Sequence, residues 1–175
     1  MSYIITFTGK KFSFTNPCID DICIEDIAHA LSLENRFGGH TAWPYSVAQH
    51  CIGASYIAPA GFEFEALMHD AAEAYCKDIP SPLKAILPDY KTVEMTVETL
   101  IRLRFGLPVM MSREVKHTDL VMLASEKIAL QIQDNEPWEI LHGIEPAPYA
   151  IVPMDHVEVE REFLRRFYEL SGAGS

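Results

Sequence analysis

The chain has 175 residues, 49% of them hydrophobic and 22% charged, so it is long enough for one domain with a sizeable core and short for two. Its 25 acidic and 14 basic side chains give a formal net charge of −11, which argues against polymeric nucleic acid as a partner. Apolar runs are short and the first residues lack the pattern of a secretory signal, so we expect no membrane partner and a cytoplasmic location. Four cysteines without a close CxxC pair predict reduced thiols: Cys18, Cys23, Cys51 and Cys76.

Alternating apolar and polar residues from Ile4 to Phe14 predict a short β-hairpin that turns at Gly9 and Lys10. Beyond it, apolar residues recur at helical spacing in segments that proline and glycine interrupt. These segments predict six helices: Ile24 to Leu33, Ser46 to Ala58, Phe62 to Cys76, Tyr90 to Phe105, Ser112 to Ile132 and His156 to Leu170. The residues from Glu136 to Pro153 include four prolines and predict a long ordered loop. We therefore expect an all-α helical bundle with a short N-terminal β-hairpin.

Two of these helices carry a polar side chain on the face that should pack. His50 lies beside Val47, Cys51 and Ala54 at helical spacing, so its imidazole faces inward. Asp119 lies on the packing face of its own helix, where a lone buried carboxylate is costly. Some other group must therefore compensate the charge of Asp119.

A third helix places ionisable residues in one narrow sector, because at about 100° per residue Glu73 falls between His69 and Asp70. Two imidazoles and two carboxylates from three helices suit a borderline divalent cation and leave positions open for water and substrate. We therefore predict one divalent transition metal, with cobalt, zinc, manganese and iron all compatible, held by His50, His69, Asp70 and Asp119. The alternative is a metal-free helical protein in which His50 is a core histidine.

The order H…HD…D at these four positions resembles the HD-domain phosphohydrolase superfamily. The similarity is greatest to its small branch of bacterial 5′-deoxynucleotidases of the YfbR kind and phage dATP triphosphohydrolases. It extends from Ile24 to Ile132 and includes NRFGGHT with Arg36, SVAQH, HDAAEAYCKDIPSPLK and KHTD. The resemblance implies an HD-domain fold and a metal-dependent phosphohydrolase of 2′-deoxynucleotides. Only His117 lies between HD and the last aspartate, so the histidine pair of two-metal members is missing and we expect one catalytic metal, with Mg²⁺ as an additional ion on the substrate phosphates.

The same resemblance implies that Glu73 and Asp78 share the proton transfers of hydrolysis. We assign Glu73 the proton of the leaving group or of the water, and Asp78 a role in orienting water. Which of the two is the acid stays open at this point. The alternatives are a solvated helix-surface acid for Glu73 and a turn residue for Asp78.

Further residues are candidates for substrate binding. A guanidinium can bind phosphate through two parallel hydrogen bonds, and lysine and histidine can add positive charge. Phe37 and Trp43 could stack on a base or exclude a ribose hydroxyl, although apolar residues are more often core. The cationic candidates are Arg36, His40, Lys84 and Lys116.

Two substrate versions compete within the phosphohydrolase hypothesis. The segment NRFGGHTAWPYSVAQH is more similar to the phage enzymes, which favours release of tripolyphosphate from dATP or another dNTP. This version needs all four cations to converge, because a triphosphate carries about four negative charges. The alternative is a 5′-deoxynucleotidase that removes phosphate from dNMPs. A hypothesis of another class is a non-catalytic nucleotide-sensing protein that keeps the site for structure.

The resemblance also bears on organisation and partners. We expect one domain over residues 1–175, with a hairpin extension at 1–20, a metal-binding helical core at 24–132, and a loop and C-terminal helix at 133–175. The branch implies a deoxynucleotide substrate, a homo-oligomer, and the host cytoplasm as location if the chain is encoded by a phage. Three aromatic residues of the last helix could lie at an oligomer interface or in the core: Phe163, Phe167 and Tyr168.

Overall fold

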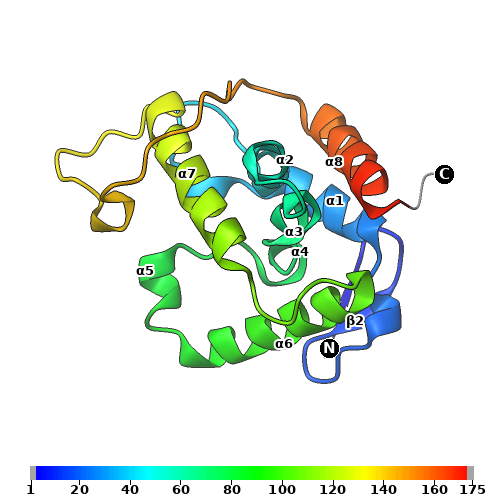
Figure 1. Ribbon diagram of the computed structural model, residues 1–175. Coiled ribbons are helices and arrows are strands. Elements are labelled where there is room, and N and C mark those ends of the chain that lie inside the picture. The colour runs from blue at the N-terminus through cyan, green and yellow to red at the C-terminus, as the bar shows by residue number, and fades with distance from the viewer. Residues whose placement is uncertain (1–2, 173–175) are drawn as a thin grey trace.

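A computed structural model describes residues 3–172 of the chain (Figure 1). The fold is mostly helical and includes a two-stranded antiparallel sheet at its N-terminus. Within the described part, no helix is both long enough and apolar enough to cross a bilayer. The elements in chain order, with η for short 3₁₀ turns, are β1 (Tyr3–Ile5), β2 (Lys11–Ser13), η1 (Ile19–Asp21), α1 (Ile24–Leu33), η2 (Arg36–Gly39), α2 (Val47–Ile57), α3 (Glu63–Met68), α4 (Glu73–Cys76), α5 (Ser81–Lys84), α6 (Pro88–Phe105), α7 (Arg113–Ala129), η3 (Glu139–Leu141) and α8 (His156–Ser171).

The predicted N-terminal hairpin is confirmed and is attached to the helical core. Ile4 pairs with Phe12 across the two strands, and Gly9 takes a φ of +84° in the turn, a conformation that favours glycine. Phe12 is fully buried and its ring lies 4.2 Å from that of Tyr75 in α4. The Phe7 ring in the turn also stacks on His29 of α1 with ring centroids 3.7 Å apart, so the hairpin packs on the helices through more than one aromatic side chain.

The main hydrophobic core extends from β2 to α8 and includes side chains of α1, α2, α4 and α6. Figure 1 shows α8 alongside α1, and the two helices are in contact. Phe163 and Phe167 of α8 are buried in this core, whereas Tyr168 is 39% exposed. Two of the three aromatic residues considered for an oligomer interface are thus core residues and are unavailable to a partner.

The predicted continuous helix from Phe62 to Cys76 is wrong. α3 ends at Met68 and α4 begins at Glu73, and between them backbone amides bond to carbonyls three residues back, as Glu73 does to Asp70. This tightened backbone differs from an α-helix, in which adjacent side chains diverge by about 100°. The break is where His69 lies, and its consequence for the metal site is described below.

The helix predicted from Ile24 to Leu33 has these bounds in the structure, the other predicted helices are confirmed with shifted ends, and one short helix was missed. The helix predicted from Tyr90 begins at Pro88, which fits the first turn because proline needs no amide partner there. The helix predicted to reach Ile132 ends at Ala129. α5 was not predicted, since its four residues are too few to show a helical period.

The loop from 130 to 155 is ordered against α2 and α7, as predicted. The amide of Ala147 donates to Ser125 Oγ at 2.9 Å, and Gln49 Nε2 donates to the Val152 carbonyl at 3.2 Å. Gly53 in α2 permits this packing, because a Cβ there would lie 3.0 Å from the ring of Tyr149. The loop therefore holds α7 against α2, the two helices that carry His50 and Asp119.

A buried ion pair joins α3 to α6 at the start of α7. Arg102 and Glu65 are 3% and 5% exposed, and the guanidinium lies 3.5 Å from the carboxylate. Glu65 also accepts from the Ser112 amide at 2.8 Å, and Arg102 donates to the Pro108 carbonyl at 2.9 Å. This network fixes the turn from which α7 departs.

Glu65→Ala should therefore lower the free energy of unfolding by about 3 kcal/mol, because it leaves a buried guanidinium without its buried partner. Glu98 is the matched control, since it pairs with the same Arg102 at 2.9 Å but its side chain is 35% exposed. Glu98→Ala should cost less than about 1 kcal/mol. Urea denaturation measures the free energy of unfolding of both variants. Equal losses would show that the buried pair with Glu65 contributes no more to stability than the exposed pair with Glu98.

Candidate metal centre

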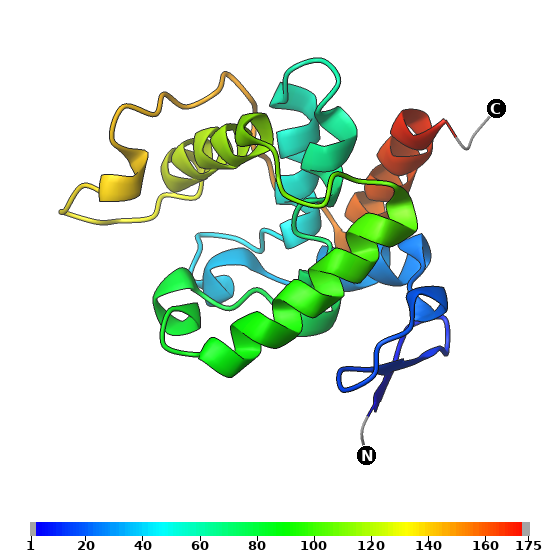
Figure 2. The same ribbon diagram turned by 60° about the horizontal axis from the view of Figure 1, so that its bottom comes forward.

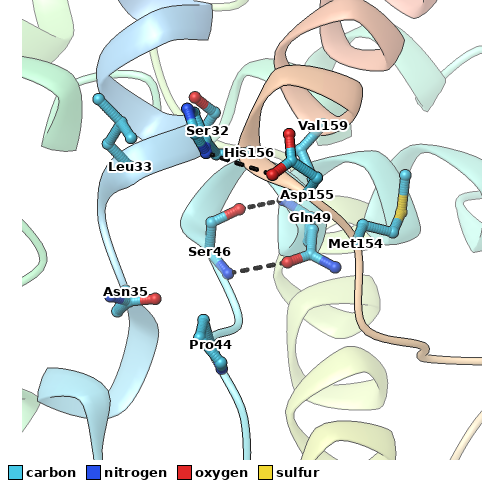
Figure 3. A pocket seen from close by; sticks show the side chains of 10 residues that line it. All are labelled: Ser32, Leu33, Asn35, Pro44, Ser46, Gln49, Met154, Asp155, His156 and Val159. Carbon is cyan, nitrogen blue, oxygen red and sulfur yellow. Dashed lines mark hydrogen bonds and ion pairs between the residues drawn. The ribbon is translucent and has the colours of Figure 1, made fainter.

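His50 owes its position to the start of α2. Ser46 caps the helix: its side chain accepts from the Gln49 amide at 3.2 Å, and the Gln49 side chain accepts from the Ser46 amide at 3.2 Å (Figure 3). This reciprocal cap fixes where the helix begins and which residues face inward. His50 follows one turn into α2 and is fully buried, as its place in the apolar stripe predicts.

Four donor atoms from three parts of the chain converge. His50 Nε2 lies 3.2 Å from His69 Nε2 and 3.1 Å from Asp119 Oδ1. Asp70 Oδ2 lies 3.2 Å from His69 Nε2 and 3.7 Å from His50 Nε2. Ligands about 2.1 Å from one ion lie about 3.0 to 3.4 Å apart in octahedral or tetrahedral arrangements. His50, His69 and Asp119 thus form a candidate metal-binding group compatible with a divalent cation, and Asp70 lies beside it.

The break after α3 lets His69 and Asp70 reach this point together. Adjacent residues on a regular α-helix point about 100° apart, but here Asp70 Oδ2 is 3.2 Å from His69 Nε2. The sequence-based placement of both residues at one site is therefore supported, although the continuous helix assumed for it is not.

The positions of the protons on the two imidazoles are compatible with a bound cation. His69 Nδ1 lies 2.7 Å from the Ala66 carbonyl, which can only accept, so Nδ1 donates. His50 Nδ1 lies 2.5 Å from Glu126 Oε1 and donates in the same way. Neutral imidazoles then direct two Nε2 lone pairs at each other across 3.2 Å. A cation between them removes this repulsion, and the Nδ1 partners are of the kind that orient metal-bound histidines.

The local charge balance also fits a divalent cation. The Arg36 guanidinium contacts the carboxylates of Glu126 and Asp70, and Asp119 adds a third carboxylate beside His50. Burial lowers the pKa of an imidazole, yet the Asp70 carboxylate raises the pKa of His69 well above its usual range. Burial alone would raise the pKa of Asp70, but His69 lowers it to about 2. The cluster therefore requires positive charge. Protonation of both imidazoles would supply this charge poorly, because the two Nε2 protons would then face each other across 3.2 Å.

Sequence reasoning missed Glu126, the carboxylate behind His50. Its side chain is fully buried, bonds to His50 Nδ1 and accepts from Arg36 Nη2 at 3.0 Å. The Arg36 and His50 groups lower its pKa although burial opposes this. Glu126 follows Asp119 by seven residues, two turns along the same face of α7, and this spacing was the available signal.

Arg36 lies beyond α1, in η2, with its side chain 12% exposed. Phe37 adopts a φ of +56°, and two glycines with positive φ follow it. A left-handed phenylalanine is uncommon and is held by the surrounding structure. The Arg36 amide donates to the Tyr45 carbonyl at 2.9 Å, which closes this loop. The guanidinium reaches both Glu126 and Asp70, at 3.0 and 3.6 Å.

A cavity of about 590 Å³ opens beside the metal ligands. Figures 1 and 2 show that α5 and η3, which contribute to its walls, lie on the same side of the molecule, and η3 is in contact with α7. Asp70 and Asp119 line the cavity, and so do the following residues predicted from the sequence: Arg36, Phe37, Glu73, Asp78 and Lys84.

Three predicted binding residues do not line this cavity. His40 and Lys116 are exposed, on the loop after η2 and on α7, and Trp43 is half-buried elsewhere in the loop. A sequence does not show where a loop leads or which side of α7 Lys116 faces, so it could not place these three residues relative to the cavity. Trp138 and Ile140, which were not predicted, line the cavity instead.

Within the cavity wall, Glu73 is buried and its Oε2 atom has no hydrogen-bond partner among residues 3–172. Burial, with the Asp70 and Asp78 carboxylates, raises the pKa of Glu73 well above its usual range. Burial also raises the pKa of Asp78. Lys84 Nζ lies 4.0 Å from Glu73 Oε1 and 2.7 Å from Glu94 Oε1.

Cys51 offers a competing ligand set with His69 and Asp70. The thiol is fully buried, and burial raises its pKa to about 11. A thiolate is the form that binds metal, so this set is chemically weaker than the one with His50 and Asp119. All four cysteines are free.

Glu126→Gln should weaken metal affinity about 10- to 100-fold, because His50 loses the carboxylate that fixes its ring. Titration with Co²⁺ followed by visible absorption measures the affinity. Glu160→Gln is the matched control, since Glu160 makes a 2.9 Å contact with the Nδ1 of His29, a histidine outside the centre. Equal metal affinities of the two variants would show that Glu126 does not support metal binding.

The comparisons with known proteins place the chain in a family. No protein-family model matches it. It is 48% identical over 173 residues to the uncharacterized protein YfdR of Escherichia coli (strain K12), covering 98% of this chain and 97% of that protein. It is also 33% identical over 138 residues to an uncharacterized protein of Rhodobacter capsulatus, covering 70% of each. The chain therefore belongs to the same protein family as YfdR of Escherichia coli.

Proposed function

We propose that the chain is an HD-domain phosphohydrolase that cleaves phosphate esters of 2′-deoxynucleotides with one divalent metal ion. The observation that carries the proposal is the convergence of His50, His69, Asp70 and Asp119 on one point at the wall of a cavity. A purely structural metal site has no need of an adjoining cavity lined by further acids and a lysine. The resemblance of the H…HD…D pattern supports the reaction class and the deoxynucleotide.

The chemistry divides between a cation and the cavity wall. His50, His69, Asp70 and Asp119 would hold a divalent cation, which would polarise a phosphoryl oxygen and lower the pKa of a water molecule. Asp78 accepts the proton of the attacking water. Glu73 gives its proton to the leaving oxygen as the phosphorus–oxygen bond breaks, because burial and the neighbouring Asp70 and Asp78 carboxylates raise its pKa and so favour the protonated form. Lys84 and Arg36 stabilise the negative charge on the phosphoryl group.

The charge of the cavity favours a monophosphate over a triphosphate. Among the described residues, the cavity is lined by two cationic side chains, Arg36 and Lys84, and four carboxylates. The triphosphate version required His40 and Lys116 as well, and both lie outside the lining. A triphosphate with about four negative charges would meet too few cations. We therefore propose that the substrates are 2′-deoxynucleoside 5′-monophosphates, and that the enzyme is a 5′-deoxynucleotidase.

Glu73→Gln should keep the metal and lower turnover by at least about 100-fold, because the amide cannot supply the proton. Asp119→Ala should lose both metal and activity, because it removes a ligand. Elemental analysis gives the metal content, and phosphate release gives the activity. Glu114→Gln, on the exposed side of α7, is the control and should change neither. Full activity in Glu73→Gln, or in metal-free protein, would overturn the mechanism.

A substrate panel with Mn²⁺, Co²⁺, Fe²⁺ and Zn²⁺ separates the proposed activities. We expect dNMPs to release phosphate that malachite green detects directly. A triphosphohydrolase would instead release tripolyphosphate, which becomes detectable only after a separate phosphatase is added. Tripolyphosphate from dATP, without phosphate from any dNMP, would replace the monophosphate proposal. Metal binding without turnover of any nucleotide would favour the sensing protein.

A further inference from the structure

The cavity has an apolar part that the proposed chemistry does not use. Leu120 and Leu123 of α7 line it together with Trp138 and Ile140, which lie in the segment from Asp134 to Leu141. We call this segment the η3 arm. The four side chains carry no charge, whereas the phosphate chemistry described above uses charged groups.

The apolar part extends along α7 from Leu120, next to the metal ligand Asp119, to Trp138 near the end of the helix. Trp138 packs against Lys127, whose ammonium lies 4.4 Å from the ring centroid. Lys127 follows Asp119 by eight residues, which corresponds to about 12 Å of helix. An inorganic phosphate at the metal cannot bridge this separation, but a ligand with a sugar and a further ring can.

The indole of Trp138 is held in place, and its N–H group already has a hydrogen-bond partner. Its Nε1–H donates to Asp134 Oδ2 at 2.6 Å, and Lys127 covers the ring. What Trp138 offers to the cavity is therefore carbon surface, held in place from two directions. A flat, rigid apolar surface is suited to a flat aromatic ring.

We propose that Trp138 stacks on the nucleobase of the substrate, and that the η3 arm makes the site select nucleotides over sugar phosphates that lack a base. This inference rests on the proposed function and names the part of the substrate that the cavity recognises. The side chains of Leu120, Leu123 and Ile140 offer no hydrogen-bonding group, and the Trp138 N–H is occupied. The base is therefore held by its face rather than read by its edge, and the four bases are accepted to within about tenfold.

The test compares Trp138→Ala with the wild type on two substrates, a dNMP and 2-deoxyribose 5-phosphate. Loss of stacking should raise KM for the dNMP at least about fivefold and leave KM for the base-free phosphate unchanged. Trp138→Phe should retain most of the affinity for the dNMP because it keeps an aromatic ring. Ile128→Ala is the control, since Ile128 is 68% exposed on α7 and does not line the cavity.

A binding measurement separates this inference from the proposed function. A dNMP added to metal-loaded protein should quench the tryptophan fluorescence of the wild type, and the quenching should be lost in Trp138→Phe. If nucleotides quench Trp138 but no phosphate is released, the proposed hydrolysis fails and the base site stands. If dNMPs are hydrolysed and Trp138→Ala raises KM equally for both substrates, hydrolysis stands and the base site is refuted. More than about 100-fold selectivity for one base would refute recognition by stacking.

Discussion

Two buried imidazoles whose Nε2 atoms lie 3.2 Å apart are the constraint on which the account depends. The Ala66 carbonyl and the Glu126 carboxylate accept hydrogen bonds from Nδ1 of His69 and His50, so in the neutral rings each Nε2 atom carries a lone pair that can bind a cation. In an apolar interior this arrangement is unfavourable without a positive charge between the rings. The carboxylates of Asp70 and Asp119 at the same point add to the requirement.

The fold meets this requirement by placing three separate features at one position. α2 begins at a reciprocal cap, which directs His50 inward. The backbone tightens after α3, which brings His69 and Asp70 together. α7 supplies Asp119 to the donors and Glu126 behind them, two turns apart. Buried ionisable side chains and a tightened helix end therefore occur together at one site, which is typical of function and not of stability.

Much of this arrangement was predictable from the sequence, because polar residues on packing faces are costly and therefore informative. His50 was identified in that way and is fully buried, whereas Asp119 was identified by the same argument but its side chain is 40% exposed. Glu126 was missed, although its spacing from Asp119 was a usable signal. Trp138 could not have been placed, because it lies in an irregular loop whose path depends on contacts with α2 and α7. Trp43 was chosen instead, since it lies close in sequence to the other candidates.

X-ray absorption spectroscopy of the cobalt-loaded protein tests the metal centre most directly. The account predicts one ion per chain with two imidazole nitrogens and otherwise oxygen ligands, and loss of one imidazole in His50→Ala. A sulfur ligand at about 2.3 Å would place the ion at the Cys51 set, and failure to bind cobalt would leave no metal centre. Either result would contradict the account.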